Sequence, residues 1–234
     1  MKTLIIDSNI DPIWWGAPDL MRTCENFPGI SFSIRRAPQR DLPKRLLDYD
    51  RYILSGSFTR IDDSSDWIQE LEEVVQKLVS HKKPILGICF GHQMLIRAIG
   101  GIDYVGKSNQ AEFGWTKIEV DHSSILFNGL PKQFFSFSSH YDEVKRLPKD
   151  FVQLAHSNAC AHQAFELRGA PVFGIQFHPE RIPSEAKKVY LENKTKHQKK
   201  KIPFLGKGQD QKLYNPDIGQ TIFKNFFALD GVGP

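Results

Sequence analysis

Short apolar runs separated by amphipathic stretches mark the first half of the chain. Residues 3–7, 52–54 and 84–88 form such runs, and their length predicts buried strands of a parallel sheet. Between the second and third runs, residues 66–80 repeat apolar side chains at helical spacing, with Asp66 as the expected N-cap. The first half therefore alternates strands with helices, as a parallel sheet requires.

The second half has a different pattern, in which strand-like runs follow one another closely. Residues 114–120, 151–155, 164–167 and 172–177 are rich in β-branched and aromatic side chains and are joined by short connections. The two halves together predict an α/β fold, a three-layer αβα sandwich. Its central sheet should be mostly parallel, covered by helices on both faces and extended by an antiparallel section.

The length favours a single domain. A chain of 234 residues is long for one average domain and short for two full ones, so we expect residues 1–234 to form one domain. A polar, lysine-rich and glycine-containing stretch at about residues 190–216 interrupts the pattern, and an amphipathic helix is expected after it, over 218–229. We interpret this stretch as an insertion or mobile excursion.

Charge and cysteine content narrow the function classes. Much of the excess in the formal charge of +4 lies in residues 194–201. Such a run is usually a solvated loop; the alternative is docking of an acidic partner or nucleic acid, and no aromatic platform supports the latter. Three cysteines suit neither a disulfide framework nor a paired-cysteine metal site. The chain turns polar too early for a signal peptide and has no membrane-length apolar run, so we expect a cytoplasmic protein without metal or cofactor.

The chemically most informative feature is the Gly-x-Cys-x-Gly sequence around Cys89, between the strand at 84–88 and a helix expected over 91–99. A sharp strand-to-helix turn lifts a nucleophile out of the sheet, and glycines are needed because the backbone passes close to its neighbours. The helix N-terminus also favours the thiolate. The N–H groups of Phe90 and Gly56 are then the natural oxyanion donors. The alternative is that Cys89 is only a small buried apolar residue.

Hydrolysis through a thiolate also needs an acid–base group. His178 directly follows the strand at 172–177, and Glu180 can reach the far nitrogen of its imidazole and fix the tautomer. His140 is the serious rival for this role. His92 would take it only in an unrelated cysteine hydrolase, in which the histidine directly follows the nucleophile.

Together these motifs resemble the class I glutamine amidotransferase family. The resemblance extends from about residue 4 to residue 180 and rests on the paired motifs at 87–93 and 177–180. It implies that Cys89 is the nucleophile, that the histidine and glutamate of the second motif are its acid–base pair, and that Gly56 belongs to the oxyanion hole.

The resemblance also implies which residues bind substrate. Gln93 matches the residue that recognises glutamine, and Ser139, His140 and Tyr141 match the segment that holds its amino-acid end. Tyr141 stands where the family commonly has glycine, so the substrate could differ in shape from glutamine. The loop at 112–115 is closest to that of the amidotransferase domain of GMP synthetases.

Three functions stay open at this point. The leading hypothesis is hydrolysis of the glutamine side-chain amide through a cysteinyl thioester. Because the sequence contains no pyrophosphate-binding loop of a synthetase, a separate synthetase subunit would have to accept the ammonia. The alternatives are a γ-glutamyl peptidase acting on glutathione-like substrates and a catalytically silent regulatory subunit.

Overall fold

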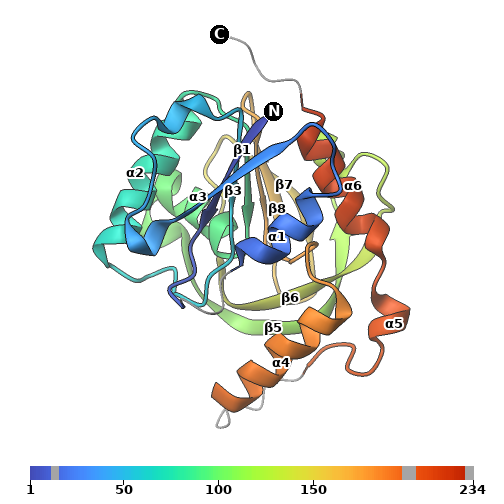
Figure 1. Cartoon of the computed structure of the whole chain (residues 1–234). Coiled ribbons are helices and arrows are strands. Elements are labelled where there is room, and N and C mark those ends of the chain that lie inside the picture. Colours follow the sequence, from blue (N-terminus) through green and yellow to red (C-terminus); the bar gives the residue numbers. More distant parts are fainter. Residues whose placement is uncertain (12–15, 197–203, 230–234) are drawn as a thin grey trace.

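The described strands form one sheet, and helices lie on both of its faces (Figure 1). The computed structural model describes residues 1–11, 16–196 and 204–229. The strands are β1 (Lys2–Asp7), β2 (Ser31–Arg36), β3 (Arg51–Leu54), β4 (Ile85–Ile88), β5 (Val105–Val120), β6 (Gln133–Val144), β7 (Phe151–His156), β8 (Ala164–Leu167) and β9 (Val172–Ile175). The helices are α1 (Ala17–Cys24), α2 (Asp66–Ser80), α3 (Phe90–Gly100), α4 (Pro183–Lys196), α5 (Asp210–Leu213) and α6 (Pro216–Phe227).

Parallel and antiparallel pairing divide the sheet into two parts. The strand order is β2-β1-β3-β4-β9-β8-β7-β5-β6, and the strands from β2 to β9 in this order run parallel. From β9 onward every pairing is antiparallel. The predicted α/β fold with an antiparallel extension is confirmed. The extension is larger than the sequence suggested, because each part contains four pairings.

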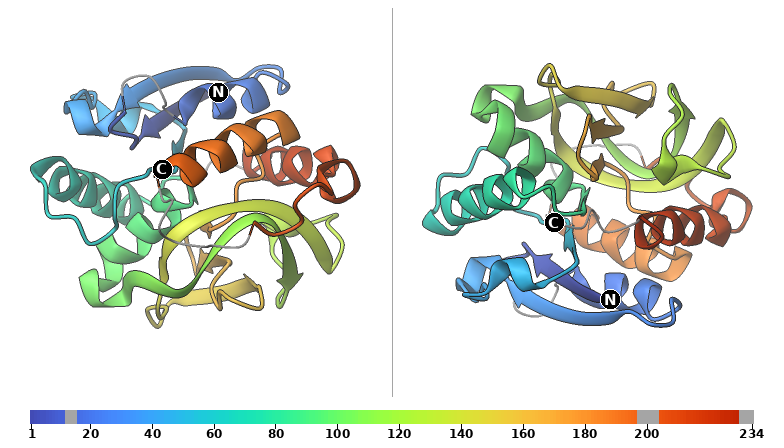
Figure 2. Two further views of the ribbon diagram at one scale, coloured as in Figure 1. Left: turned by 90° about the horizontal axis from the view of Figure 1, so that it is seen from below. Right: turned by 90° about the horizontal axis from the view of Figure 1, so that it is seen from above.

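Apolar cores on the two faces of the sheet give the three layers. The core under α2 and α3 includes Leu71 and Met94, and the core under α1 and α6 includes Leu20 and Phe223. Each fully buried side chain of this size contributes about 1.5–3 kcal/mol relative to exposure. Figure 2 shows the two sets of helices on opposite sides of the strands. The carboxyl ends of β3, β4 and β9 lie side by side between them, which is where α/β folds place their sites.

The predicted helix at 66–80 matches the bounds of α2, but its predicted cap is wrong. Ser65 is the N-cap, and Asp66 is the first helical residue. Asp63 explains the difference, because its Oδ1 accepts hydrogen bonds from the backbone N–H and the hydroxyl of Ser65, at 2.8 and 2.6 Å. These bonds hold Ser65 in the extended conformation of a cap.

The stretch at 190–216 contains regular structure that its polarity did not predict. Helix α4 extends into it, α5 lies within it, and Leu205 between them bonds to β5: its N–H donates to the carbonyl of Phe113 at 2.7 Å, and its carbonyl accepts from Trp115 at 3.0 Å. The side chains of the lysine-rich run at 194–201 lie outside the described residues. No helix in the described ranges is long and apolar enough to span a membrane.

Candidate active site

Cys89 occupies a strained elbow between β4 and α3. Its backbone has φ 53° and ψ −103°, a left-handed conformation that costs a non-glycine residue roughly 1–3 kcal/mol. The flanking glycines are required by close approach, since a β-carbon on Gly87 would lie 2.5 Å from the carbonyl oxygen of Gly91, and one on Gly91 would clash with the carbonyl of Leu54. The elbow geometry expected from the sequence is therefore present.

Hydrogen bonds tie this elbow to the neighbouring strands. The N–H of Cys89 donates to the carbonyl of Ile175 at 2.8 Å, and the N–H of Gly91 donates to the carbonyl of Ser55 at 3.2 Å. Phe90 begins α3, where backbone N–H groups have no partner within the helix. Its N–H is thus placed beside the sulfur, at the positive end of the helix dipole.

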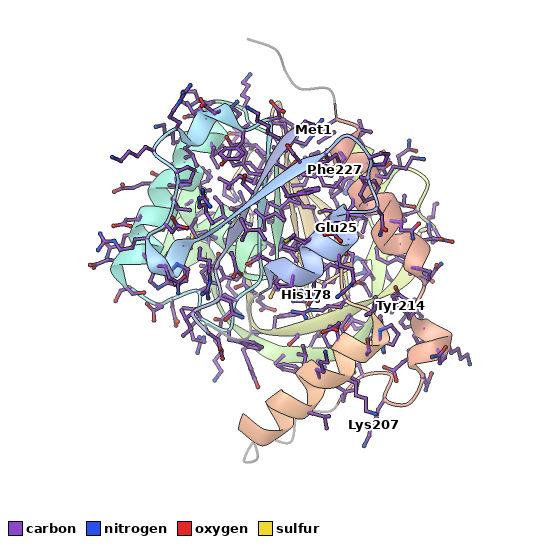
Figure 3. All side chains as sticks on the ribbon, viewed as in Figure 1. Met1, Glu25, His178, Lys207, Tyr214 and Phe227 are labelled. Carbon is purple, nitrogen blue, oxygen red and sulfur yellow. The ribbon has the colours of Figure 1, made fainter. Side chains whose placement is uncertain are left out.

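His178 lies next to Cys89 despite their separation in sequence. Its backbone N–H donates to the carbonyl of Phe137 at 2.7 Å, and its imidazole lines the smaller cavity beside Cys89, close enough for the sulfur to raise the pKa of the imidazole. A β-carbon on Gly56 would lie 2.9 Å from Cε1 of His178 and 3.5 Å from Cβ of Cys89. The backbone of Gly56 thus covers both groups. In the view of Figure 3, His178 lies between α1 and α4.

Glu180 completes a buried chain of three groups. Nδ1 of His178 and Oε1 of Glu180 are 2.6 Å apart, and both side chains are almost fully buried. Burial acts to lower the pKa of His178, but the charges of Glu180 and Cys89 and hydrogen bonds to both raise it. Burial likewise acts to raise the pKa of Glu180, yet the charge and hydrogen bond of His178 lower it. The arrangement favours an imidazolium held between a carboxylate and a sulfur.

Two pockets meet at Cys89. The larger, about 340 Å³ in volume, is lined by Ser57, Phe58, Thr59, Arg60, Cys89, Gln93, Phe113, Ser139, His140, Tyr141 and Asp142. The smaller, about 40 Å³, is lined by Asn9, Gly16, Leu20, Ser55, Gly56, Ser57, Phe58, Cys89, Phe137, Ser139, His178, Glu180, Arg181 and Val189. His178 lines the smaller of these two pockets and not the larger, while Gln93 and Tyr141 line the larger and not the smaller. The sulfur therefore separates an acid–base side from a larger binding side.

The residues expected to bind substrate gather around the larger pocket. Gln93 is buried, and its Nε2 donates to the backbone carbonyl of Asp142 at 2.7 Å and to Oε1 of Gln176 at 2.9 Å. The carbonyl of Ser139 lies 3.8 Å from the sulfur of Cys89. Tyr141 packs its ring against Phe113, with centroids 4.8 Å apart. Together with His140, all four expected residues line the larger pocket.

A buried carboxylate supports the loop that carries Gly56. Oδ1 of Asp7, at the end of β1, accepts a hydrogen bond from Oγ of Ser55 at 2.9 Å and one from the N–H of Gly16 at 3.3 Å. Burial raises the pKa of Asp7, although these bonds and the charge of Arg36 oppose the shift. Sequence reasoning missed this support. Its signal was an acidic residue at the carboxyl end of a buried strand.

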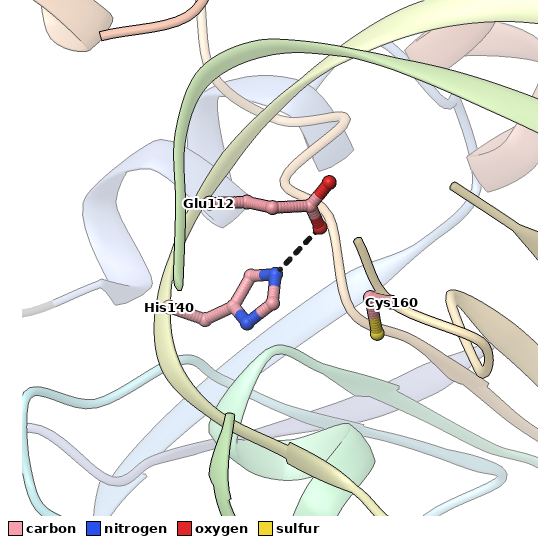
Figure 4. A group of neighbouring side chains, drawn as sticks. All are labelled: Glu112, His140 and Cys160. Atoms are coloured by element: carbon pink, nitrogen blue, oxygen red, sulfur yellow. Dashed lines mark hydrogen bonds and ion pairs between the residues drawn. The ribbon is translucent and has the colours of Figure 1, made fainter. Parts of the chain in front are cut away.

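Three side chains of metal-ligating type lie together, and one of them, His140, lines the larger pocket (Figure 4). The ligand atoms of Glu112, His140 and Cys160 are all within 4.8 Å of one another. Both oxygens of Glu112 already have partners: Oε1 accepts from Ser157 at 2.7 Å, and Oε2 lies 2.6 Å from Nε2 of Gln163 and 3.0 Å from Nε2 of His140. Burial raises the pKa of the Cys160 thiol. The group is a hydrogen-bonded network with its carboxylate oxygens occupied.

The two rival histidines are held away from acid–base chemistry at the sulfur. Nδ1 of His140 faces the backbone carbonyl of Asp142 at 3.0 Å, while its other nitrogen faces Glu112. His92 is fully buried and packs against Phe165 with tilted rings, whose centroids are 4.5 Å apart. Neither lines the smaller pocket that contains the imidazole of His178.

Known proteins share both the sequence family and the fold. A family model described as "Glutamine amidotransferase class-I" matches residues 28–198. Several archaeal proteins that are named as a subunit of glutamine-hydrolysing GMP synthase are similar in sequence. The one from Methanocaldococcus jannaschii is 39% identical over 126 residues, which is 54% of this chain and 66% of that protein. The one from Pyrococcus abyssi is 38% identical over 122 residues, 52% and 64% of the two chains. The matches thus span less than two thirds of these relatives.

Solved structures extend the likeness over nearly the whole chain. A structure described as a GMP synthase subunit protein from Thermoplasma acidophilum has a TM-score of 0.71 at 27% identity, covering 97% of this chain and 92% of that one. A glutamine amidotransferase from Thermotoga maritima has a TM-score of 0.78 at 21% identity, with 98% and 99% coverage. The second likeness shows the fold alone.

Proposed function

The chain belongs to the class I glutamine amidotransferase family, and we propose that it hydrolyses the side-chain amide of glutamine to glutamate and ammonia through a cysteinyl thioester. One observation carries the proposal: Cys89, His178 and Glu180 converge at the carboxyl ends of β4 and β9, with the sulfur open to two pockets. A nucleophile, an acid–base group and an orienting carboxylate are the parts that acyl transfer requires.

The first half of the reaction forms the thioester. The thiolate of Cys89 attacks the side-chain carbonyl carbon, and the N–H groups of Phe90 and Gly56 stabilise the oxyanion. The imidazolium of His178 gives its proton to the amide nitrogen, the C–N bond breaks, and ammonia leaves. Because the pKa of His178 is raised, the imidazole stays protonated until the proton passes to the leaving amine.

The second half regenerates the enzyme. The neutral imidazole takes a proton from water as the water oxygen attacks the thioester carbonyl. The C–S bond then breaks, glutamate leaves, and the thiolate is restored beside the imidazolium. Glu180 holds Nδ1 of His178 throughout at 2.6 Å, so that Nε2 stays directed toward the reacting atoms.

The space around the sulfur favours glutamine over a γ-glutamyl peptide. The leaving amine must lie on the side of the acid, which is the smaller pocket. A volume of 40 Å³ holds about three water-sized molecules. Ammonia and an attacking water fit there, whereas a dipeptide leaving group would have to extend beyond this volume. The larger pocket, which contains Gln93 and Tyr141, takes the amino-acid end of the substrate.

We also infer a separate ammonia acceptor. Relatives from several archaea are named as one lettered subunit of a glutamine-hydrolysing GMP synthase, a name that implies a second subunit in those proteins. For this chain the acceptor is a proposal, tested by co-purification and by measuring whether glutamine turnover rises when the bound protein is present.

Product analysis tests the proposed activity. The protein is incubated with glutamine and, separately, with glutathione, while ammonia, glutamate and cysteinylglycine are measured. We expect ammonia and glutamate in equal amounts from glutamine, and no turnover by a Cys89→Ala variant. Cysteinylglycine release that exceeds ammonia release would instead favour the γ-glutamyl peptidase. Equal rates in the wild type and in Cys89→Ala would refute catalysis by Cys89.

A further inference from the structure

Three buried apolar side chains from different elements line the smaller pocket. Leu20 comes from α1, Phe137 from β6 and Val189 from α4, and all three are buried. The remaining lining consists of one exposed apolar side chain, Phe58, and of polar, charged or small residues. These three side chains therefore limit how far a leaving group can extend from the sulfur.

Val189 differs from the other two because its helix, α4, leads into the stretch at about 190–216 that the sequence predicts to be an insertion. Ala186 and Val189 are three residues apart and therefore share one face of the helix. This face packs against Trp115 and Phe137 in a small apolar cluster. The opposite side of α4 is exposed at Leu191. Figure 1 shows α4 next to β5 and β6.

Residues that follow α4 support the apolar cluster into which Val189 packs. Beyond the helix, Leu205 forms two backbone hydrogen bonds with β5, and Nε1 of Trp115 donates to Oδ1 of Asp210 at 2.9 Å. Phe204 and Tyr214 pack at the edge of the same cluster. A wall anchored at this many points acts as a fixed boundary of the pocket.

We propose that Val189 determines specificity by setting the upper size of the leaving amine, so that ammonia leaves and substituted amines are excluded. The inference rests on the proposed glutamine hydrolysis and assigns to Val189 the role of limiting the leaving amine in that site. A single methylene in a packed pocket changes kcat/KM about 10- to 200-fold, so one residue is enough to produce the selection. The acylation step involves the same bonds for each amine: the C–S bond forms, the C–N bond breaks, and the imidazolium proton passes to the leaving nitrogen.

A homologous series of amides provides the test. Rates are measured for glutamine, γ-glutamyl methylamide, γ-glutamyl ethylamide and glutathione, and kcat/KM for each amide is divided by that for glutamine. The wild type should lose about tenfold or more for each added carbon. Val189→Ala should raise the methylamide ratio about tenfold, and Val189→Leu should lower it. The ratio cancels any effect of the substitutions on the amount of folded protein.

Leu191→Ala is the matched control, because it shortens an exposed aliphatic side chain on the same helix. It should leave every ratio at the wild-type value. Glutamine hydrolysis with unchanged ratios in both Val189 variants would overturn the assignment, as would an equal change in Leu191→Ala. Absence of hydrolysis of every compound by the wild type would instead refute the proposed function.

Discussion

Replacing His92 by leucine should make the protein less sensitive to acid. His92 is fully buried, and burial lowers its pKa from 6.5 to about 3, an effect that nearby His162 and His140 reinforce and backbone contacts at Gly174 and His162 oppose. The folded protein therefore keeps this imidazole neutral at pH 5, whereas the unfolded chain protonates it below about pH 6.5. Since the unfolded state binds the extra proton, stability falls as the pH drops through this window.

The size of the effect follows from the two pKa values. Each pH unit below the unfolded pKa costs about 1.4 kcal/mol, so the wild type should lose about 2 kcal/mol of unfolding free energy between pH 7 and pH 5 from this group alone. In His92→Leu this part of the loss disappears, while all other titrating groups remain. Between pH 7 and pH 5, the unfolding free energy of the wild type should thus fall by about 2 kcal/mol more than that of His92→Leu.

Urea unfolding at both pH values measures this difference. An exposed-site variant, His122→Gln, is the control for replacement of a histidine as such, because His122 is exposed. Identical pH dependence in His92→Leu and the wild type would show that His92 is not a buried neutral group. The same variant should still hydrolyse glutamine at neutral pH; complete loss of turnover in a folded His92→Leu protein would support the alternative in which His92 is the base.

Three further substitutions probe the site. Glu180→Gln removes the charge that holds the neighbouring imidazole and should lower kcat about 100-fold or more with unchanged circular dichroism; a loss below about threefold would contradict the role. Gly91→Ala should cost about 3 kcal/mol or more in urea unfolding, since its β-carbon meets the carbonyl of Leu54, and wild-type stability would refute the packing. Glu112→Gln weakens the network around His140 and should raise KM for glutamine more than it lowers kcat; an effect on kcat alone would argue against positioning.

Elements with a simple apolar period were predictable. The bounds of α2 match the predicted helix, and β1, β3, β4 and β7 lie where short apolar runs occur. Strand β6 was missed because Ser138, His140 and Asp142 interrupt its apolar pattern, although all three are buried. Their burial depends on partners from distant segments, such as Glu112 for His140. No local pattern carries that information.

The active site also combines local features with contacts between distant segments. The elbow at Cys89 and the strand-end position of His178 are local features, so the sequence predicted both, and the sheet order brings them together. Asp7 supports the Gly56 loop through a hydrogen bond with Ser55, which lies 48 positions further along the chain. Val189 lines the smaller pocket from α4, a helix of polar composition. Only the packed structure reveals these contributions.

The most direct measurement is covalent labelling with a glutamine-like diazo-ketone, followed by peptide mapping. Burial raises the pKa of Cys24 to about 12 and raises that of Cys160 as well, so neither thiol should react. The account predicts one label per chain, on Cys89, slowed by free glutamine and abolished in His178→Ala. Label on Cys24 or Cys160, or labelling of Cys89 that glutamine does not slow, would contradict it.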